Sequence, residues 1–408
     1  MAVLRHVLGW LRSPRLALGL IAFLAAWCGV GAWASFARGS APAPGWAAAT
    51  GLDRPFSSWP FLAGNALLFA STAACALPRW RRCLAASRGA LPPGAAPFPA
   101  RPGQDLESFL RARGFARRGD ALVRWRAGFW GGWILHLGLL GLLASVAVQQ
   151  LFHDEGLFRL ASGEAVSLDQ PGVVFGRERG PLAPESPPAV EATLAAFDPF
   201  QRQAGYVIDR RSRLGLRSRA GRLTATLDRA AGVTFEGIDF FQAIPTGLAL
   251  RLEWPDGRYT VLDLLEAGEH RSVVGVDDPM LGRGTFVAES ERDVHDQAGT
   301  GRLSVRFETA EGARLVSDAA PFGPTGARLA RVDRWGEYKY SRDPGLPGVL
   351  ASFLLLLAGS ALLAVPAGVA RLGGEGEPWA GLVFVQRGGE ALRSDWEGAA
   401  SVEGDGEE

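Results

Sequence analysis

The sequence predicts an integral membrane protein with four transmembrane α-helices and a large all-β domain, a sandwich or an open barrel, between helices three and four. Four uncharged apolar segments are each about 19–23 residues long, which is the length that an α-helix needs to cross a bilayer. These segments are Leu16–Ser35, Trp59–Leu77, Phe129–Leu151 and Gly348–Ala370. The stretch 152–346 instead contains short runs of β-branched and aromatic residues separated by turn residues.

Arginine predicts the orientation of the four segments, because basic residues in short flanking loops are retained on the cytoplasmic side. Three arginines precede the first segment, and eleven lie between the second and the third: Arg79, Arg81, Arg82, Arg88, Arg101, Arg111, Arg113, Arg117, Arg118, Arg124 and Arg126. The loop between the first two segments has only Arg38 and Arg54. We therefore expect both termini in the cytoplasm and residues 152–346 on the opposite side. A cleaved signal peptide ending near Ala32-Trp33-Ala34 is a weaker alternative, because this apolar core is longer than a signal peptide needs.

This orientation divides the chain into six parts. They are an N-terminal helix pair (1–77), an arginine-rich cytoplasmic loop (78–128), the third helix (129–151), the extracytoplasmic β-rich domain (152–346), the fourth helix (347–370) and an acidic cytoplasmic tail (371–408). Within the loop, residues 89–103 are rich in Pro, Gly and Ala and read as a linker. The formal net charge is +1, so the chain has no global basic excess for binding nucleic acid. The exported domain contains no cysteine, which excludes an internal disulfide.

Within the β-rich domain, the strongest local signal is the pair Asp256-Gly257, which predicts a hairpin between Leu248–Glu253 and Tyr259–Leu262. Thr234–Gln242 is predicted as one strand, and Ala327–Tyr340 as the last strand before the fourth helix. The spacing leaves open whether the domain is one sandwich or two smaller sheets.

Motifs of self-contained catalysis are missing from the sequence, which has no Gly-x-Ser-x-Gly elbow, no phosphate-binding loop and no His-Glu-x-x-His pair. Two exported histidines, His270 and His295, lie near acidic residues, Asp277, Asp278, Asp293 and Asp296. Their spacing matches no regular ligand pattern, so ordinary loop residues are the better interpretation. His153 is interpreted as an interfacial histidine solvated beside acids.

His136 is the only ionisable side chain within the third apolar segment. A polar side chain in hydrocarbon is costly without a partner, so an intramembrane histidine usually serves an ion, proton or cofactor path. Trp133 and Leu140 share its helical face, and nearby glycines (Gly128, Gly131, Gly132, Gly138 and Gly141) allow a helix or a flat ligand to approach. From the residues alone, a structural histidine and a cofactor or proton role are equally supported.

The chain resembles the ResB/CcsB family, the membrane subunit of system II cytochrome c maturation. Four stretches carry the resemblance in order: Ser13–Leu20, Gly128–Leu140, Gly232–Ala243, and Asp343-Pro344-Gly345 leading into the fourth segment. The predicted topology is also that of the family.

The resemblance implies a multi-pass protein of the bacterial inner membrane that works with a CcsA/ResC-like partner. Together they would carry haem b across the membrane and attach it to apocytochrome c, with His136 as an axial ligand of the haem iron and Trp133 beside the cofactor. The chain would then be an accessory subunit of a haem lyase complex rather than a complete enzyme. Two alternatives remain: a haem-free adaptor whose exported domain binds apocytochrome or a thiol-reducing protein, and a membrane-anchored sensor with a β-rich ligand domain.

Overall fold

The computed structural model divides the chain into two units: one unit joins residues 1–151 to 345–408, and the other comprises Phe152–Pro344. The structure describes residues 2–38, 44–100, 105–203, 206–228, 231–268, 270–292, 301–317, 320–323, 325–374 and 379–398.

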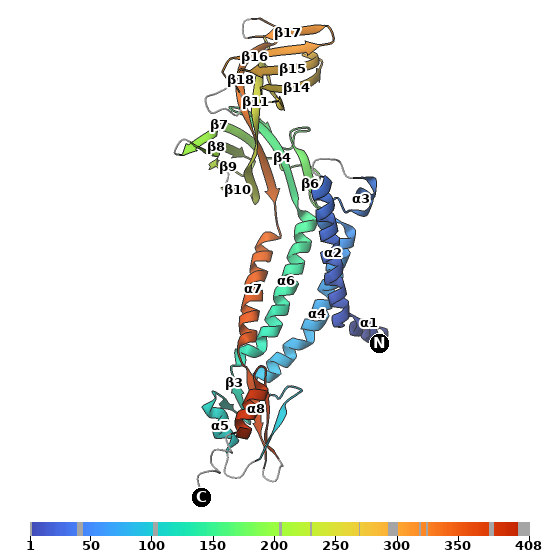
Figure 1. Cartoon of the computed structure of the whole chain (residues 1–408), viewed down its shortest axis with the longest axis vertical. Coiled ribbons are helices and arrows are strands. Elements are labelled where there is room, and N and C mark those ends of the chain that lie inside the picture. The colour runs from blue at the N-terminus through green and yellow to red at the C-terminus, as the bar shows by residue number, and fades with distance from the viewer. Residues whose placement is uncertain are drawn as a thin grey trace. The chain divides into compact units, whose positions relative to one another are not determined.

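Four helices of the first unit are long and apolar enough to cross a membrane, as predicted. They are α2 (Pro14–Arg38), α4 (Trp59–Ser87), α6 (Gly131–Phe152) and α7 (Leu346–Ala364), and they are joined by the shorter α1 (Ala2–Leu11), α3 (Gly45–Thr50), η1 (Pro55–Ser57) and η2 (Arg126–Trp130) (Figure 1). Two ends differ from the prediction. The second helix continues past Leu77 to Ser87, and the fourth ends at Ala364 rather than at Ala370.

The second helix continues because another residue replaces the hydrogen bond that Pro78 removes. Proline lacks the N–H that would donate to the carbonyl four residues earlier, here Ala74. Arg12, which follows α1, donates its Nε–H to this carbonyl at 3.1 Å, and the Ser71 hydroxyl donates to the carbonyl of Leu11 at 2.6 Å. The α1–α2 corner therefore satisfies the backbone of α4 where its own ladder is interrupted.

Replacing Arg12 with methionine should leave the Ala74 carbonyl without a donor and lower the unfolding free energy by about 1–3 kcal/mol. In a Pro78→Ala background, the restored N–H can donate to this carbonyl, so the same substitution should cost much less. A double-mutant cycle on unfolding in detergent micelles measures this coupling. An equal cost in both backgrounds would show that Arg12 acts elsewhere.

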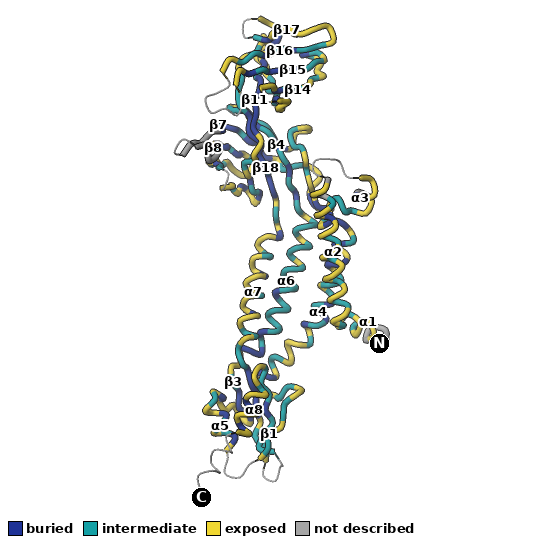
Figure 2. The backbone as a smooth tube through the Cα atoms, viewed as in Figure 1, coloured by how far each residue is buried: buried dark blue, intermediate teal, exposed yellow. Residues whose placement is uncertain are grey.

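Small residues bring α6 and α7 into backbone contact along two seven-residue repeats. The small residues at this spacing are Gly131, Gly138 and Ser145 on α6 and Gly345, Ser352 and Gly359 on or beside α7. Gly131 lies against Gly359, Gly138 against the backbone of Leu356, and Ser145 against Gly345. A Cβ built on Gly359 would lie only 2.6 Å from the backbone nitrogen of Leu135. The sequence left open whether these glycines contact a helix or a flat ligand, and in the structure most of them contact α7. The outer surface of α7 is exposed over most of its length (Figure 2).

Aromatic side chains are exposed at both ends of this helix group. Trp33 and Trp59 lie at one end of the antiparallel pair α2 and α4, and Trp10 and Trp80 lie toward the other. Trp125, which directly precedes η2, is also exposed. Amphipathic aromatics favour the two boundaries of a bilayer, so their placement agrees with a membrane-spanning group.

The loop and the tail that the sequence separates form one small domain. Its antiparallel sheet has the order β1-β20-β19-β3-β2, and helices α5 and α8 pack with it. The elements are β1 (Ala96–Pro99), α5 (Leu106–Ala112), β2 (Ala116–Arg118), β3 (Ala121–Arg124), β19 (Gly368–Leu372), β20 (Trp379–Val385) and α8 (Gly389–Gly398). Phe98, within the expected linker, is buried, as is Trp396 within the expected acidic tail. The apolar faces of both segments are too short to form a core alone and bury one another.

The second unit is built from antiparallel β-structure, as predicted, in three sheets that form two lobes. Its strands are β4 (Asp154–Ala161), β5 (Ala165–Ser167), β6 (Phe175–Arg179), β7 (Glu191–Gln203), β8 (Tyr206–Arg217), β9 (Arg222–Leu227), β10 (Val233–Phe235), β11 (Ile238–Glu253), β12 (Tyr259–Asp263), β13 (Leu265–Gly268), β14 (Arg271–Asp278), β15 (Gly282–Ser290), β16 (Leu303–Thr309), β17 (Gly312–Val316) and β18 (Arg328–Arg342). One core includes Phe158, Leu214 and Tyr338; the other includes Leu250 and Phe286.

Two long strands, β11 and β18, run through both lobes, and their pairing is interrupted between Gln242 and Thr246 (Figure 1). The first lobe adds the sheet β5-β7-β8-β9, and the second adds β13-β14-β15-β16-β17. The Asp256-Gly257 hairpin is confirmed by the β11–β12 pairing. The prediction of one strand over Thr234–Gln242 is wrong, because Glu236 and Gly237 adopt positive φ angles of 53° and 74° and turn the chain back on itself.

Candidate functional site

His136 lies on the face of α6 that is turned away from α7. At 100° per residue, Gly131 and Gly138 mark the α7 face, and His136 lies more than a quarter-turn from both. The opposite neighbour is α4, since Asn65 of α4 donates to the carbonyl of Leu143 at 3.0 Å on the same side of α6. The small-residue contact with α7 therefore orients the imidazole toward α4.

Hydrogen bonding determines which nitrogen of His136 carries the proton. Nδ1 lies 2.6 Å from the carbonyl oxygen of Gly132, one turn earlier, and this oxygen can only accept. Nδ1 is therefore the protonated nitrogen of the neutral ring, and the Nε2 lone pair points away from the α6 backbone. Metal-binding histidines commonly have this arrangement, in which one nitrogen donates to a backbone carbonyl and the other is left for the metal. The residues present thus fit an axial ligand.

Arg79 of α4 is the partner that the sequence analysis missed. Its Nη1 lies 3.2 Å from Nε2 and 3.4 Å from Nδ1 of His136, so the guanidinium lies against the imidazole ring and leaves the Nε2 lone pair open. The sequence counted Arg79 as an orienting charge in a loop, because the uncharged run ends at Leu77 and Pro78 resembles a helix end. The absence of glycine between Pro78 and Gly89 was the available signal that the helix could continue.

Trp133, the second residue predicted beside the cofactor, packs against another tryptophan. Its ring lies 5.7 Å from that of Trp130, at an interplanar angle of 78°. Within the described chain, no hydrogen bond or ring contact joins Trp133 to His136. The structure thus places Trp133 and His136 on the same helix, and among the described side chains it brings Arg79 to the imidazole.

The other histidines with sequence-based interpretations divide into two cases. His153 lies 3.2 Å from the Asp343 carboxylate and 3.7 Å from that of Glu155, which agrees with a histidine beside acids. His270 is exposed in a turn, while His295, Asp293 and Asp296 lie outside the described residues. In the described part of the chain, no three His, Cys, Asp or Glu side chains are grouped to hold a metal ion.

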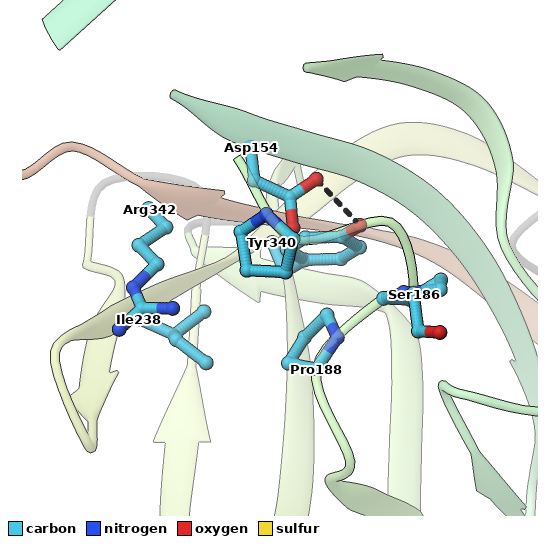
Figure 3. Close-up of a pocket in the computed structure, with 8 residues that line it drawn as sticks. Asp154, Ser186, Pro188, Ile238, Tyr340 and Arg342 are labelled. Atoms are coloured by element: carbon cyan, nitrogen blue, oxygen red, sulfur yellow. Dashed lines mark hydrogen bonds between the residues drawn. The ribbon is translucent and has the colours of Figure 1, made fainter. Parts of the chain in front are cut away.

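A pocket in the second unit surrounds the buried carboxylate of Asp154 (Figure 3). Asp154 accepts two hydrogen bonds from Arg177, at 2.8 and 3.0 Å, and one from the Tyr340 hydroxyl at 3.3 Å. Burial and the nearby Asp154 charge raise the pKa of Tyr340 above its usual value. Arg177 also donates to the carbonyls of Pro184 and Ser186, so it anchors this loop to β4. The cavity is about 80 Å³, far below the ~300 Å³ of an ordinary ligand pocket, and its carboxylate is already paired. These contacts support a structural role.

Comparison with protein families identifies residues 35–178 as ResB-like. The resemblance to the ResB family is therefore confirmed. The match includes α4 and α6, and so both Arg79 and His136. Of the four ResB-like stretches named from the sequence, it contains Gly128–Leu140, whereas Ser13–Leu20, Gly232–Ala243 and the stretch from Asp343 onward lie outside it. A search of curated proteins finds no match. Among solved structures, the chain is similar to one named cytochrome c heme lyase CcmF, with 12% identity, coverage of 84% of this chain and 34% of that chain, and a TM-score of 0.26. The chain thus spans about a third of the length of that protein.

Proposed function

We propose that this ResB-like protein is a cytochrome c biogenesis subunit that carries haem b across the bacterial inner membrane with a CcsA/ResC-type partner. His136 acts as an axial ligand of the haem iron through Nε2. The exported β unit then presents the haem together with apocytochrome c, and thioether formation takes place at the partner's site. Both termini and the β1-β20-β19-β3-β2 domain lie in the cytoplasm in this proposal.

The single observation that carries this proposal is the hydrogen bonding of His136 on a ResB-like membrane helix. The Gly132 carbonyl holds the imidazole as the neutral tautomer with a free Nε2 lone pair, which is the form that binds iron. Nδ1 of His136 therefore already has its hydrogen-bond acceptor, and this bond fixes the orientation of the ring before a ligand binds. The iron, when bound, supplies a Lewis-acid centre that this lone pair can coordinate.

The test is the absorbance of haem in the purified complex of the full chain and its partner. His136→Ala should remove most of the bound haem, because the iron loses an axial ligand from this chain. Added imidazole should restore the absorbance, because it can enter the space left by the ring. This recovery separates a lost ligand from a misfolded protein.

His270→Ala is the matched control, since it removes an exposed imidazole in the second unit and should leave the bound haem unchanged. The proposal fails if His136→Ala retains the same pigment at the same occupancy. In that case the haem-free adaptor is favoured, with His136 serving only as a hydrogen-bonding link between α6 and α4.

A further inference from the structure

Arg79 is a charged side chain on a membrane helix, and none of the described residues is an acidic partner for it. In the part of the chain that the structure describes, no carboxylate lies within the 4.0 Å ion-pair distance of its guanidinium. Its recorded side-chain contact is instead the ring of His136, at 3.2 Å from Nε2 and 3.4 Å from Nδ1. Exposed Trp80 places this part of α4 toward a boundary of the bilayer, where a ligand could supply an anion to the guanidinium.

Arg79 and a metal ion would not compete for one position on His136. A single guanidinium nitrogen, Nη1, lies 3.2 Å from Nε2 and 3.4 Å from Nδ1, so it faces the imidazole ring rather than the Nε2 lone pair, which projects from the ring edge. The lone pair is therefore open to iron while the guanidinium lies beside the ring. The side chain is exposed and has several rotatable bonds, so it can turn toward a group beside the imidazole.

We propose that Arg79 is a positioning residue that binds a carboxylate of the iron porphyrin while His136 coordinates its iron. This inference rests on the proposed function. A carboxylate supplies both features that the site lacks, an anion for the charge and acceptors for the planar fork of guanidinium donors. Arg79 therefore lies beside the imidazole in the empty site and fixes the porphyrin edge in the loaded one. The pair selects a porphyrin that carries free carboxylates.

The test compares haemin with haemin dimethyl ester, in which the two carboxylates are uncharged, on the full chain in complex with its partner. The wild type should bind haemin roughly tenfold or more tightly than the ester, as expected for a charge-assisted hydrogen bond. Arg79→Gln should lower the affinity for haemin to about that for the ester and change ester binding by less than about threefold. Arg79→Lys keeps the positive charge but loses the planar pair of guanidinium donors, so it should reduce the preference for haemin over its ester by a smaller factor.

Arg82→Gln is the matched control, because it removes an exposed guanidinium less than one turn further along α4 and should preserve the preference for haemin. The inference is overturned if Arg79→Gln and Arg79→Lys leave this preference unchanged. It is also overturned if both variants weaken haemin and its ester equally, which is the result expected when Arg79 only joins two helices or pairs with a lipid phosphate. Failure of the proposed function is distinguishable, since His136→Ala would then retain its pigment whatever the Arg79 variants do.

Discussion

Replacing Gly359 with alanine is expected to destabilise the helix pair α6–α7 by about 1–3 kcal/mol, although alanine is the better helix former. The added methyl would lie 2.6 Å from the backbone nitrogen of Leu135 and 3.0 Å from the carbonyl oxygen of Gly131. Both are backbone atoms, so a change of rotamer cannot relieve the clash and the helices must move apart. Because this contact also orients His136 toward α4, the proposed function predicts that bound haem falls along with stability. The measurement is unfolding of the full chain in detergent micelles.

Gly132→Ala provides a matched comparison on the same pair of helices. Its Cβ would meet only the far end of the Leu363 side chain, at 3.8 Å, so no backbone has to move. This variant should be neutral or stabilising by up to about 1 kcal/mol, as expected for glycine to alanine in a helix interior. The two substitutions make the same chemical change. If Gly359→Ala lowers stability and Gly132→Ala does not, the difference is due to the close backbone contact at Gly359. Equal effects at the two positions would contradict a backbone contact at Gly359.

The sequence analysis located features whose cause is local and missed those that depend on distant partners. Three of the four membrane helices follow directly from length and apolar composition, and the Asp256-Gly257 hairpin follows from its turn residues. Pro78 misled the prediction because the donor that replaces its missing N–H comes from Arg12, which bonds the carbonyl of Ala74, 62 residues further along the chain. His136 was singled out because an ionisable side chain in an apolar segment is unusual in itself, and its role stays a prediction.

Strands that find partners far away were also missed. The segment 89–103 reads as a linker because it is rich in proline and glycine, yet β1 within it pairs with β20, near the other end of the chain. The strand β11 contains parts of two segments that were predicted separately, Thr234–Gln242 and Leu248–Glu253. An irregularity in its pairing between Gln242 and Thr246 lets the same strand belong to both lobes. Composition cannot show such pairings, because they are decided by burial against segments distant in the sequence.

Two carboxyl groups, Glu164 and Asp263, interact near the junction of the two lobes, where Trp335 packs with Ala161 and Ala249. Burial raises the pKa of Asp263 to about 7, with a further increase from the Glu164 charge that Arg159 partly offsets. The pKa of Glu164 is raised as well, mainly by burial. In the described chain, the buried Oδ1 of Asp263 has no hydrogen-bond partner. The folded protein therefore favours the protonated carboxyl at Asp263.

The raised pKa of Asp263 determines the direction in which stability changes with pH. The folded state holds the Asp263 proton up to about pH 7, whereas the unfolded chain releases it near the ordinary value of 3.8, so the folded state binds more protons between these values. Stability from this group should therefore fall as the pH rises from about 4 to 7. At about 1.4 kcal/mol per pKa unit, the full loss is on the order of 4 kcal/mol.

Asp263→Asn should remove this loss, because an amide stays neutral at every pH. The variant should be more stable than the wild type above pH 7, and the advantage should disappear near pH 4. Hydrogen–deuterium exchange of the β11–β12 amides in the full chain, corrected for the intrinsic rate at each pH, measures this difference. Asp277→Asn, at a side chain 80% exposed, should follow the wild type throughout. A wild type that gains stability from pH 4 to 7 relative to Asp263→Asn would show that the carboxylate is the favoured form and that Arg159 outweighs burial.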